Sequence, residues 1–109
     1  MKNFDWLLAA DPGDRLRMMH AMGYLKIHLP EVHLLYGVPQ RPQHHPEVDV
    51  GIHIELCLNM AAQLNLSHRA RFAVLVHDLG KALSPPEQWP SHIDHEVRGM
   101  IPVENVCDR

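Results

Sequence analysis

The amino-acid sequence predicts an all-α fold, a compact bundle of about five to six helices. Apolar residues recur at steps of three and four in several segments, as on one face of a helix. No run alternates apolar and polar residues for long enough to predict a strand, and proline and glycine separate the segments. A chain of 109 residues has room for one hydrophobic core, so we expect a single domain over residues 1–109.

The first third of the chain predicts three short helices. Residues 1–13 are expected to be an N-terminal extension or linker, with one helical segment that ends before the proline and glycine at its close. Asp14 is predicted to cap a helix over residues 15–29. A third helix is expected over residues 30–36, because a proline opens it and Gly37 follows its end.

The rest of the sequence, after residue 37, predicts two longer helices and a last helix that is interrupted by a proline. A long helix is expected within residues 48–66, after a loop with three prolines. Ser67 is predicted to cap the next helix, which is apolar nearly all round between residues 70 and 76 and is therefore expected to be the central buried helix. The last helix is predicted over residues 92–109, with a kink or break at Pro102.

Composition limits the classes of function. Lys and Arg total 10 against 13 Asp and Glu, so a formal charge of −3 provides no general basic field for nucleic acid. Cys57 and Cys107 form no C-x-x-C pair, and no segment has the length and hydropathy of a membrane span or secretion signal. We therefore expect a soluble cytoplasmic protein with no membrane partner. The ten histidines raise the question of a metal site.

A histidine and an aspartate stand side by side at the end of the apolar helix. Burying His77 and Asp78 without partners costs several kcal/mol, so a shared cation is a reasonable explanation. An αα-hairpin would bring His53 on the preceding helix beside them, giving three ligands for zinc, nickel, manganese, iron or another divalent metal. Asp49, one turn before His53, is predicted to hold the second nitrogen of that imidazole as an outer-shell partner.

Structural alternatives stay open for these residues. His77 can also be a structural residue at the C-terminus of a helix. A histidine there interacts favourably with the helix macrodipole and can form a hydrogen bond with the adjacent residue. Cys57 and Met60 follow His53 on nearly the same helix face, and a soft-metal site is one interpretation of them. Because Cys and Met at helical spacing are more often packing residues, the sequence favours the core for both.

Three stretches together resemble a known family. They are "LPEVHLLYGVPQ", "HHPEVDVGIHI" and "RFAVLVHDLGKALSPPEQWPSHIDHEVRG". Their order and content are similar to the HD phosphohydrolase superfamily, most closely to the HD domain that follows the nucleotidyltransferase in bacterial multifunctional CCA-adding enzymes. The resemblance covers roughly residues 16–109.

The resemblance implies a helical bundle of the HD-domain type that binds a divalent metal, magnesium included, and hydrolyses phosphate esters. The first motif histidine falls on His53 and the doublet on His77 and Asp78, with Asp78 as both ligand and proton acceptor. The implied activities are phosphomonoesterase, 2′,3′-cyclic phosphodiesterase and 2′-nucleotidase. The implied substrates are small nucleotides or RNA 3′-end phosphates.

Three further residues match family positions that hold phosphate. Lys81 matches the lysine after the doublet, and His92 and His95 match an H-x-x-H-E segment that holds a second metal or the substrate phosphate in larger members. A cationic lysine and a protonated histidine would stabilise charge that develops in the transition state. We therefore expect all three to be catalytic.

The sequence also departs from the family. The final metal-binding aspartate lies farther downstream than Arg109, so the sequence is read as a C-terminally truncated HD domain with one ligand fewer. No D-x-D carboxylate pair is present, and CCA addition is not expected. The alternative to an enzyme is a non-catalytic scaffold. Because the apolar helix would lack some of the family's later partners, we also expect a homo-oligomer.

Overall fold

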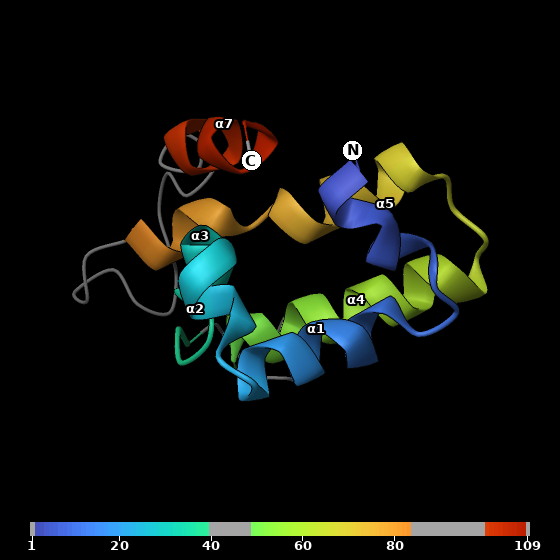
Figure 1. Cartoon of the computed structure of the whole chain (residues 1–109), viewed down its shortest axis with the longest axis horizontal. Helices are drawn as coiled ribbons and strands as arrows, with labels where there is room; N and C mark the ends of the chain where they lie inside the picture. Colours follow the sequence, from blue (N-terminus) through green and yellow to red (C-terminus); the bar gives the residue numbers. More distant parts are fainter. Residues whose placement is uncertain (1, 40–48, 84–99, 109) are drawn as a thin grey trace.

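The structure, a computed structural model, describes residues 2–39, 49–83 and 100–108 (Figure 1). These residues form helices and turns, with one isolated backbone bridge between Pro39 and Asp49 and no strand among them. The predicted all-α fold is confirmed. The elements are η1 (Lys2–Leu8), α1 (Pro12–Ala21), α2 (Tyr24–His28), α3 (Pro30–His33), α4 (Val50–Gln63), α5 (His68–Val76), η2 (Leu79–Leu83) and α7 (Met100–Cys107).

Helix α4 is the longest described element and packs against both α1 and α5. Helix α5 runs back along α4, so the end of α5 returns toward the first turns of α4 (Figure 1). Apolar side chains from nearly every described element fill the space between them. The largest fully buried ones are Leu7, Leu16, Leu25, Leu35, Ile54, Leu58, Leu75 and Leu79.

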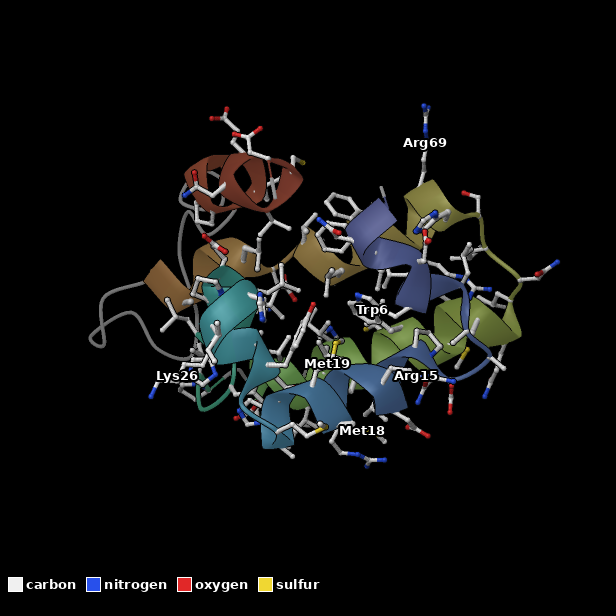
Figure 2. All side chains as sticks on the ribbon, viewed as in Figure 1. Trp6, Arg15, Met18, Met19, Lys26 and Arg69 are labelled. Atoms are coloured by element: carbon white, nitrogen blue, oxygen red, sulfur yellow. The ribbon has the colours of Figure 1, made fainter. Side chains whose placement is uncertain are left out.

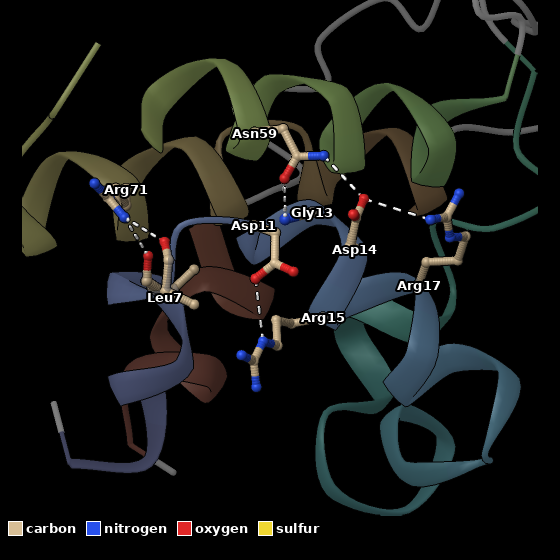
Figure 3. A network of polar contacts seen from close by, with 9 residues as sticks. Leu7, Asp11, Gly13, Asp14, Arg15, Arg17, Asn59 and Arg71 are labelled. Carbon is tan, nitrogen blue, oxygen red and sulfur yellow. Dashed lines mark hydrogen bonds and ion pairs between the residues drawn. The ribbon is translucent and has the colours of Figure 1, made fainter. Parts of the chain in front are cut away.

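Helix α1 lies against α4 at a glycine. A Cβ atom at Gly13 would fall 1.9 Å from the carbonyl oxygen of Glu55, so no other residue fits there without a backbone shift. Asn59 of α4 accepts from the Gly13 amide at 2.8 Å and donates to Asp14 at 3.1 Å (Figure 3). The prediction that Asp14 caps α1 is wrong, because α1 begins at Pro12 and Asp14 bonds across to α4.

The N-terminal segment is part of the core. Phe4 and Leu7, within residues 1–13 that are expected to be an N-terminal extension or linker, are buried. Arg71 of α5 is buried and its guanidinium donates to the carbonyls of Leu7 at 2.8 Å and Ala9 at 3.0 Å (Figure 3). A third donation, to the carbonyl of Leu66 at 2.9 Å, joins this segment to the turn before α5.

Helix α5 is buried on one side only. Arg71, Leu75 and Val76 are buried, while Ala73 is exposed, so the prediction of a central buried helix holds for one face of α5 and is wrong for the face of Ala73. Figure 2 shows the neighbouring Arg69 pointing away from the bundle. The predicted cap is confirmed, since the Ser67 hydroxyl accepts from the Ala70 amide at 3.2 Å.

Helix α7 packs against α3 and η2 and buries Val106. Pro102 lies in the first turn of α7. Backbone N–H groups of a first turn make no bond within the helix, so a proline there costs no hydrogen bond. The predicted kink is therefore not observed within α7, and residues 92–99 of the predicted last helix lie outside the described residues. No helix in the described part of the chain is long and apolar enough to cross a membrane.

Candidate metal centre

The first turn of α4 is fixed by its N-cap. The Asp49 carboxylate accepts from the Ile52 amide at 3.1 Å and from the Gly37 amide at 2.5 Å, which also ties the preceding turn to the helix. Asp49 thus acts as the N-cap of α4 through backbone donors. Its predicted outer-shell contact with the His53 imidazole stays a prediction.

Tyr36 holds the same end of α4 from the side. Its ring lies over Gly51, where a Cβ would come within 2.5 Å of a ring carbon. The Tyr36 hydroxyl donates to the buried Glu55 carboxylate at 2.7 Å. Burial, together with this carboxylate, raises the pKa of Tyr36 above its ordinary value, so the phenol keeps its proton and remains the donor. His53 therefore projects from a helix turn that is fixed on two sides.

The structure brings His53, His77 and Asp78 together, as the sequence predicts. One ligand atom from each lies within 4.8 Å of the others. Asp78 Oδ2 is the shared neighbour, 3.1 Å from His77 Nε2 and 3.9 Å from His53 Nε2. Ligands around a zinc-like ion at about 2 Å from each donor are about 3.3 Å apart, so a small inward movement suffices to bind one.

The donor chemistry fits a divalent metal. The Nδ1–H of His77 donates to the Val74 carbonyl at 2.6 Å, which leaves Nε2 to face Asp78. A second histidine and a carboxylate complete a mixed nitrogen and oxygen set of the kind that borderline divalent metals bind. Side-chain exposure falls from 45% for His77 to 5% for Asp78, so the carboxylate lies at the buried end of the group.

The electrostatics of the group favour a charged Asp78. Burial alone would raise the pKa of Asp78, but the hydrogen bond and charge of His77 and the charge of Lys81 lower it well below its ordinary value. The same hydrogen bond to Asp78 raises the pKa of His77 against the opposing effect of its burial. Lys81 Nζ, itself buried, lies 3.4 Å from Asp78 Oδ2. A fixed negative charge among cationic groups is the setting in which a metal ligand is kept deprotonated.

Cys57, for which the sequence favours a core role, contacts His53. The thiol sulfur of Cys57 lies 3.4 Å from His53 Nε2 and 3.8 Å from His53 Nδ1. Cys57 is partly buried and Met60 is exposed, so the expected core role is wrong for Met60. The i,i+4 spacing of His53 and Cys57 on α4 indicates this contact, because side chains four residues apart are neighbours on a helix.

Other candidates lie elsewhere. His92 and His95 fall outside the described residues. A cavity of about 390 Å³ lies between η1 and α2, away from the metal centre, and none of the residues predicted for catalysis or metal binding lines it. Its lining is Asn3, Phe4, Tyr24, Ile27, His28 and Leu29.

Comparison with known proteins gives close relatives over most of the chain. The multifunctional CCA protein of Xanthomonas campestris pv. campestris strain B100 is 52% identical over 102 residues, which cover 93% of this chain and 25% of that protein. The protein of the same name from Acinetobacter baylyi is 54% identical over 96 residues, 88% of this chain and 22% of its own length. No family model matches the chain, and no solved structure matches it.

The chain spans about a quarter of the length of the curated relatives it matches. The region matched by these relatives covers nearly all of the chain, and it therefore includes the segments that carry His53, His77 and Asp78. The resemblance predicted from the motifs is confirmed, and the chain is homologous to a segment of the bacterial multifunctional CCA proteins.

Proposed function

We propose that the chain is a divalent-metal-dependent phosphohydrolase of the HD type. The observation that carries the proposal is the convergence of His53, His77 and Asp78 from two helices to within 4.8 Å. Homology to multifunctional CCA proteins supports it, because the motifs of the HD superfamily fall on these same three residues. Two findings thus support the proposal: the three side chains form a suitable set of metal donors, and the family resemblance implies phosphate esters as substrates.

A divalent metal bound at this site would supply the activation of water and the neutralisation of phosphoryl charge. His53, His77 and Asp78 would hold it, and the Val74 carbonyl keeps His77 in the tautomer that offers Nε2. The ionised Asp78 carboxylate also accepts the proton that the attacking water loses. Its lowered pKa keeps this carboxylate ionised in the neutral range, as a metal ligand must be, and also makes it a weaker base than an ordinary carboxylate.

Lys81 is proposed to bind the phosphate. Its ammonium group lies 3.4 Å from Asp78 Oδ2, so it stands beside the proposed metal position. A buried cation there stabilises charge that grows on the phosphoryl oxygens in the transition state. His92 and His95 remain proposed phosphate contacts from the family resemblance.

The proposed substrates are small nucleotides and RNA 3′-end phosphates. The proposed reactions are hydrolysis of phosphomonoesters, of 2′,3′-cyclic phosphodiesters and of 2′-nucleotides. The words "CCA protein" in the names of the relatives support an RNA 3′ end as one source of such groups.

Activity of an Asp78→Asn variant tests this function. We expect the purified chain to hydrolyse 2′,3′-cyclic AMP and 2′-AMP with at least one of Mn²⁺, Ni²⁺, Co²⁺, Zn²⁺ or Mg²⁺. Asp78→Asn should abolish turnover while thermal melting shows a folded protein, and Asp5→Asn, at an exposed position, should keep full activity. Turnover that persists in Asp78→Asn would refute the proposed mechanism.

A second candidate is a module for self-association. Four apolar side chains at four-residue steps along α4 and its C-cap residue each expose between 47% and 64% of their surface. They are Ile52, Leu56, Met60 and Leu64. Exposed apolar stripes of this kind mark interaction surfaces, and we propose a second copy of the chain as the partner.

Light scattering after size exclusion tests the second candidate. A dimer of the wild-type chain that dissociates in Leu56→Glu, with helicity retained, is the expected result. The matched control is Leu8→Glu, because Leu8 is similarly exposed at 55% but lies on η1. A wild-type monomer at tens of micromolar would refute self-association through this stripe.

A further inference from the structure

Tyr36 contacts the turn of α4 that carries His53 at two points. Its ring lies against Gly51, two residues before His53, where a Cβ atom would fall 2.5 Å from the ring carbon Cδ1. Its hydroxyl donates to the Glu55 carboxylate, two residues after His53, at 2.7 Å. Glu55 is 8% exposed and Gly51 is buried, so both contacts lie inside the fold. One side chain therefore touches α4 on each side of His53 along the chain.

The Tyr36 ring is itself held by other elements. The imidazole of His20 on α1 stacks on it, with ring centroids 3.7 Å apart and ring planes inclined by 9°. Next to Tyr36 in the chain, the Leu35 carbonyl accepts from the Gly51 amide at 3.2 Å. Closely packed side chains of this kind resist displacement. The ring is thus a fixed surface against which the first turns of α4 rest.

The distance between the proposed ligands depends on where this turn of α4 lies. His53 projects from α4, whereas His77 and Asp78 follow the end of α5. His53 Nε2 lies 3.9 Å from Asp78 Oδ2, close to the separation of about 3.3 Å between two ligands of one ion. A functional site has to hold its ligands to within about 0.5 Å of the productive geometry. A residue that fixes α4 at Gly51 and Glu55 therefore affects metal affinity without touching the ion.

We infer that Tyr36 is a positioning residue of the metal centre: through its contacts with α4 it holds His53 at a distance from the other two ligands that allows all three to bind one ion. The inference rests on the proposed metal centre and deepens it. The Tyr36 ring limits how closely the first turn of α4 can approach, and the hydroxyl bond limits how far that turn can move away. Loss of contacts that orient metal ligands lowers metal affinity by about 10- to 100-fold, and this is the range expected for Tyr36.

Cobalt titration of Tyr36 variants of the 109-residue protein tests the inference without an activity assay. Bound Co²⁺ gives visible d–d bands, which increase as the site fills. We expect Tyr36→Phe, which keeps the ring and loses the hydroxyl bond, to weaken Co²⁺ binding by about tenfold. Tyr36→Leu loses both contacts and should weaken it further, by up to about a hundredfold. The matched control is Tyr24→Leu, at a tyrosine of α2 that is 44% exposed, and it should bind Co²⁺ like the wild type.

A double variant tests whether the contact with Gly51 carries the effect. Gly51→Ala puts a Cβ atom against the Tyr36 ring, so this substitution alone should weaken Co²⁺ binding by about tenfold. Adding Gly51→Ala to Tyr36→Leu should weaken binding by less than about twofold more, because the flexible leucine leaves room for the methyl group. Losses that simply multiply in the double variant would contradict this contact as the route from Tyr36 to His53 and overturn the inference.

The outcomes separate this inference from the proposed function. Circular dichroism and thermal melting identify conditions in which each metal-free variant is folded, and the affinities are compared there. Folded Tyr36→Phe and Tyr36→Leu proteins that bind Co²⁺ as tightly as the wild type would give Tyr36 a purely structural role and overturn the inference, with the metal centre left standing. A wild-type protein that binds no Co²⁺ would overturn the proposed metal centre and the inference with it. If Tyr36→Leu does not fold, the affinities of Tyr36→Phe and Gly51→Ala decide.

Discussion

His77 Nε2 lies 3.1 Å from Asp78 Oδ2, although the two residues are adjacent in the chain. Helix α5 ends at Val76, and His77 is its C-cap residue. The Val74 carbonyl fixes the other nitrogen of His77. His77 keeps helical backbone angles, so its side-chain conformation, fixed by Val74, is what directs Nε2 to Asp78.

The pH dependence of stability should report this contact in metal-free protein. The pKa of His77 is raised in the folded state, mainly by its hydrogen bond to Asp78. Its contribution is fully present below the unfolded pKa of about 6.5 and is lost as pH rises through the higher folded pKa. Because His77 is partly exposed, we expect less than about 1 kcal/mol.

Chemical denaturation between pH 5.5 and 9 in chelator measures this effect. The wild type should lose stability relative to His77→Gln as pH rises, and the other histidines cancel in that difference. A difference between the two proteins that does not change with pH would contradict the His77–Asp78 contact.

Arg71→Met should destabilise the fold strongly. The guanidinium donates to three backbone carbonyls that join the N-terminal segment to α5, and charged donors contribute about 1.5–3 kcal/mol each to a hydrogen bond. We expect a loss of about 3 kcal/mol in the free energy of unfolding. Arg69→Met, two residues earlier and exposed, should change it by less than about 0.5 kcal/mol. Similar unfolding energies for both variants would contradict this role.

Gly13→Ala should separate α1 from α4. The added Cβ would meet backbone atoms of Glu55, which cannot move aside as a flexible side chain can, so a loss of about 3 kcal/mol is expected. Gly37→Ala is the comparison, because a Cβ meets nothing within 4 Å there and only its positive φ of 87° opposes alanine. That variant should lose about 1 kcal/mol. A larger loss at Gly37 than at Gly13 would show that the close approach is unimportant.

Lys81→Met should impair catalysis more than metal binding. If Lys81 binds the phosphate, kcat/KM should fall by about a hundredfold, while the metal, held by other residues, stays bound. Lys26→Met, an exposed lysine that Figure 2 places on α2, is the control and should retain activity. Loss of metal from Lys81→Met would instead make this residue a structural support of the centre.

Local features of the fold could be predicted from the sequence. The Ser67 cap, the extent of α4 and the three converging residues His53, His77 and Asp78 depend on contacts within one turn or on the pairing of two successive helices. Such contacts follow from helical periodicity and capping preferences.

Contacts between distant segments could not be predicted in the same way. The burial of Phe4 and the Arg71 bonds to Leu7 and Ala9 join segments more than 60 residues apart. The bond from the Gly37 amide to the Asp49 carboxylate likewise depends on how the turn before α4 folds back onto the helix.

Bound metal per chain, measured by elemental analysis, tests the central claim most directly. After incubation with Zn²⁺, Ni²⁺, Co²⁺ or Mn²⁺ and desalting, we expect close to one equivalent in the wild type and almost none in His53→Ala and His77→Ala. His28→Ala, at an exposed histidine, should retain the metal. Failure of the wild-type protein to retain any of these ions, or equal retention by all three variants, would contradict a metal centre at His53, His77 and Asp78.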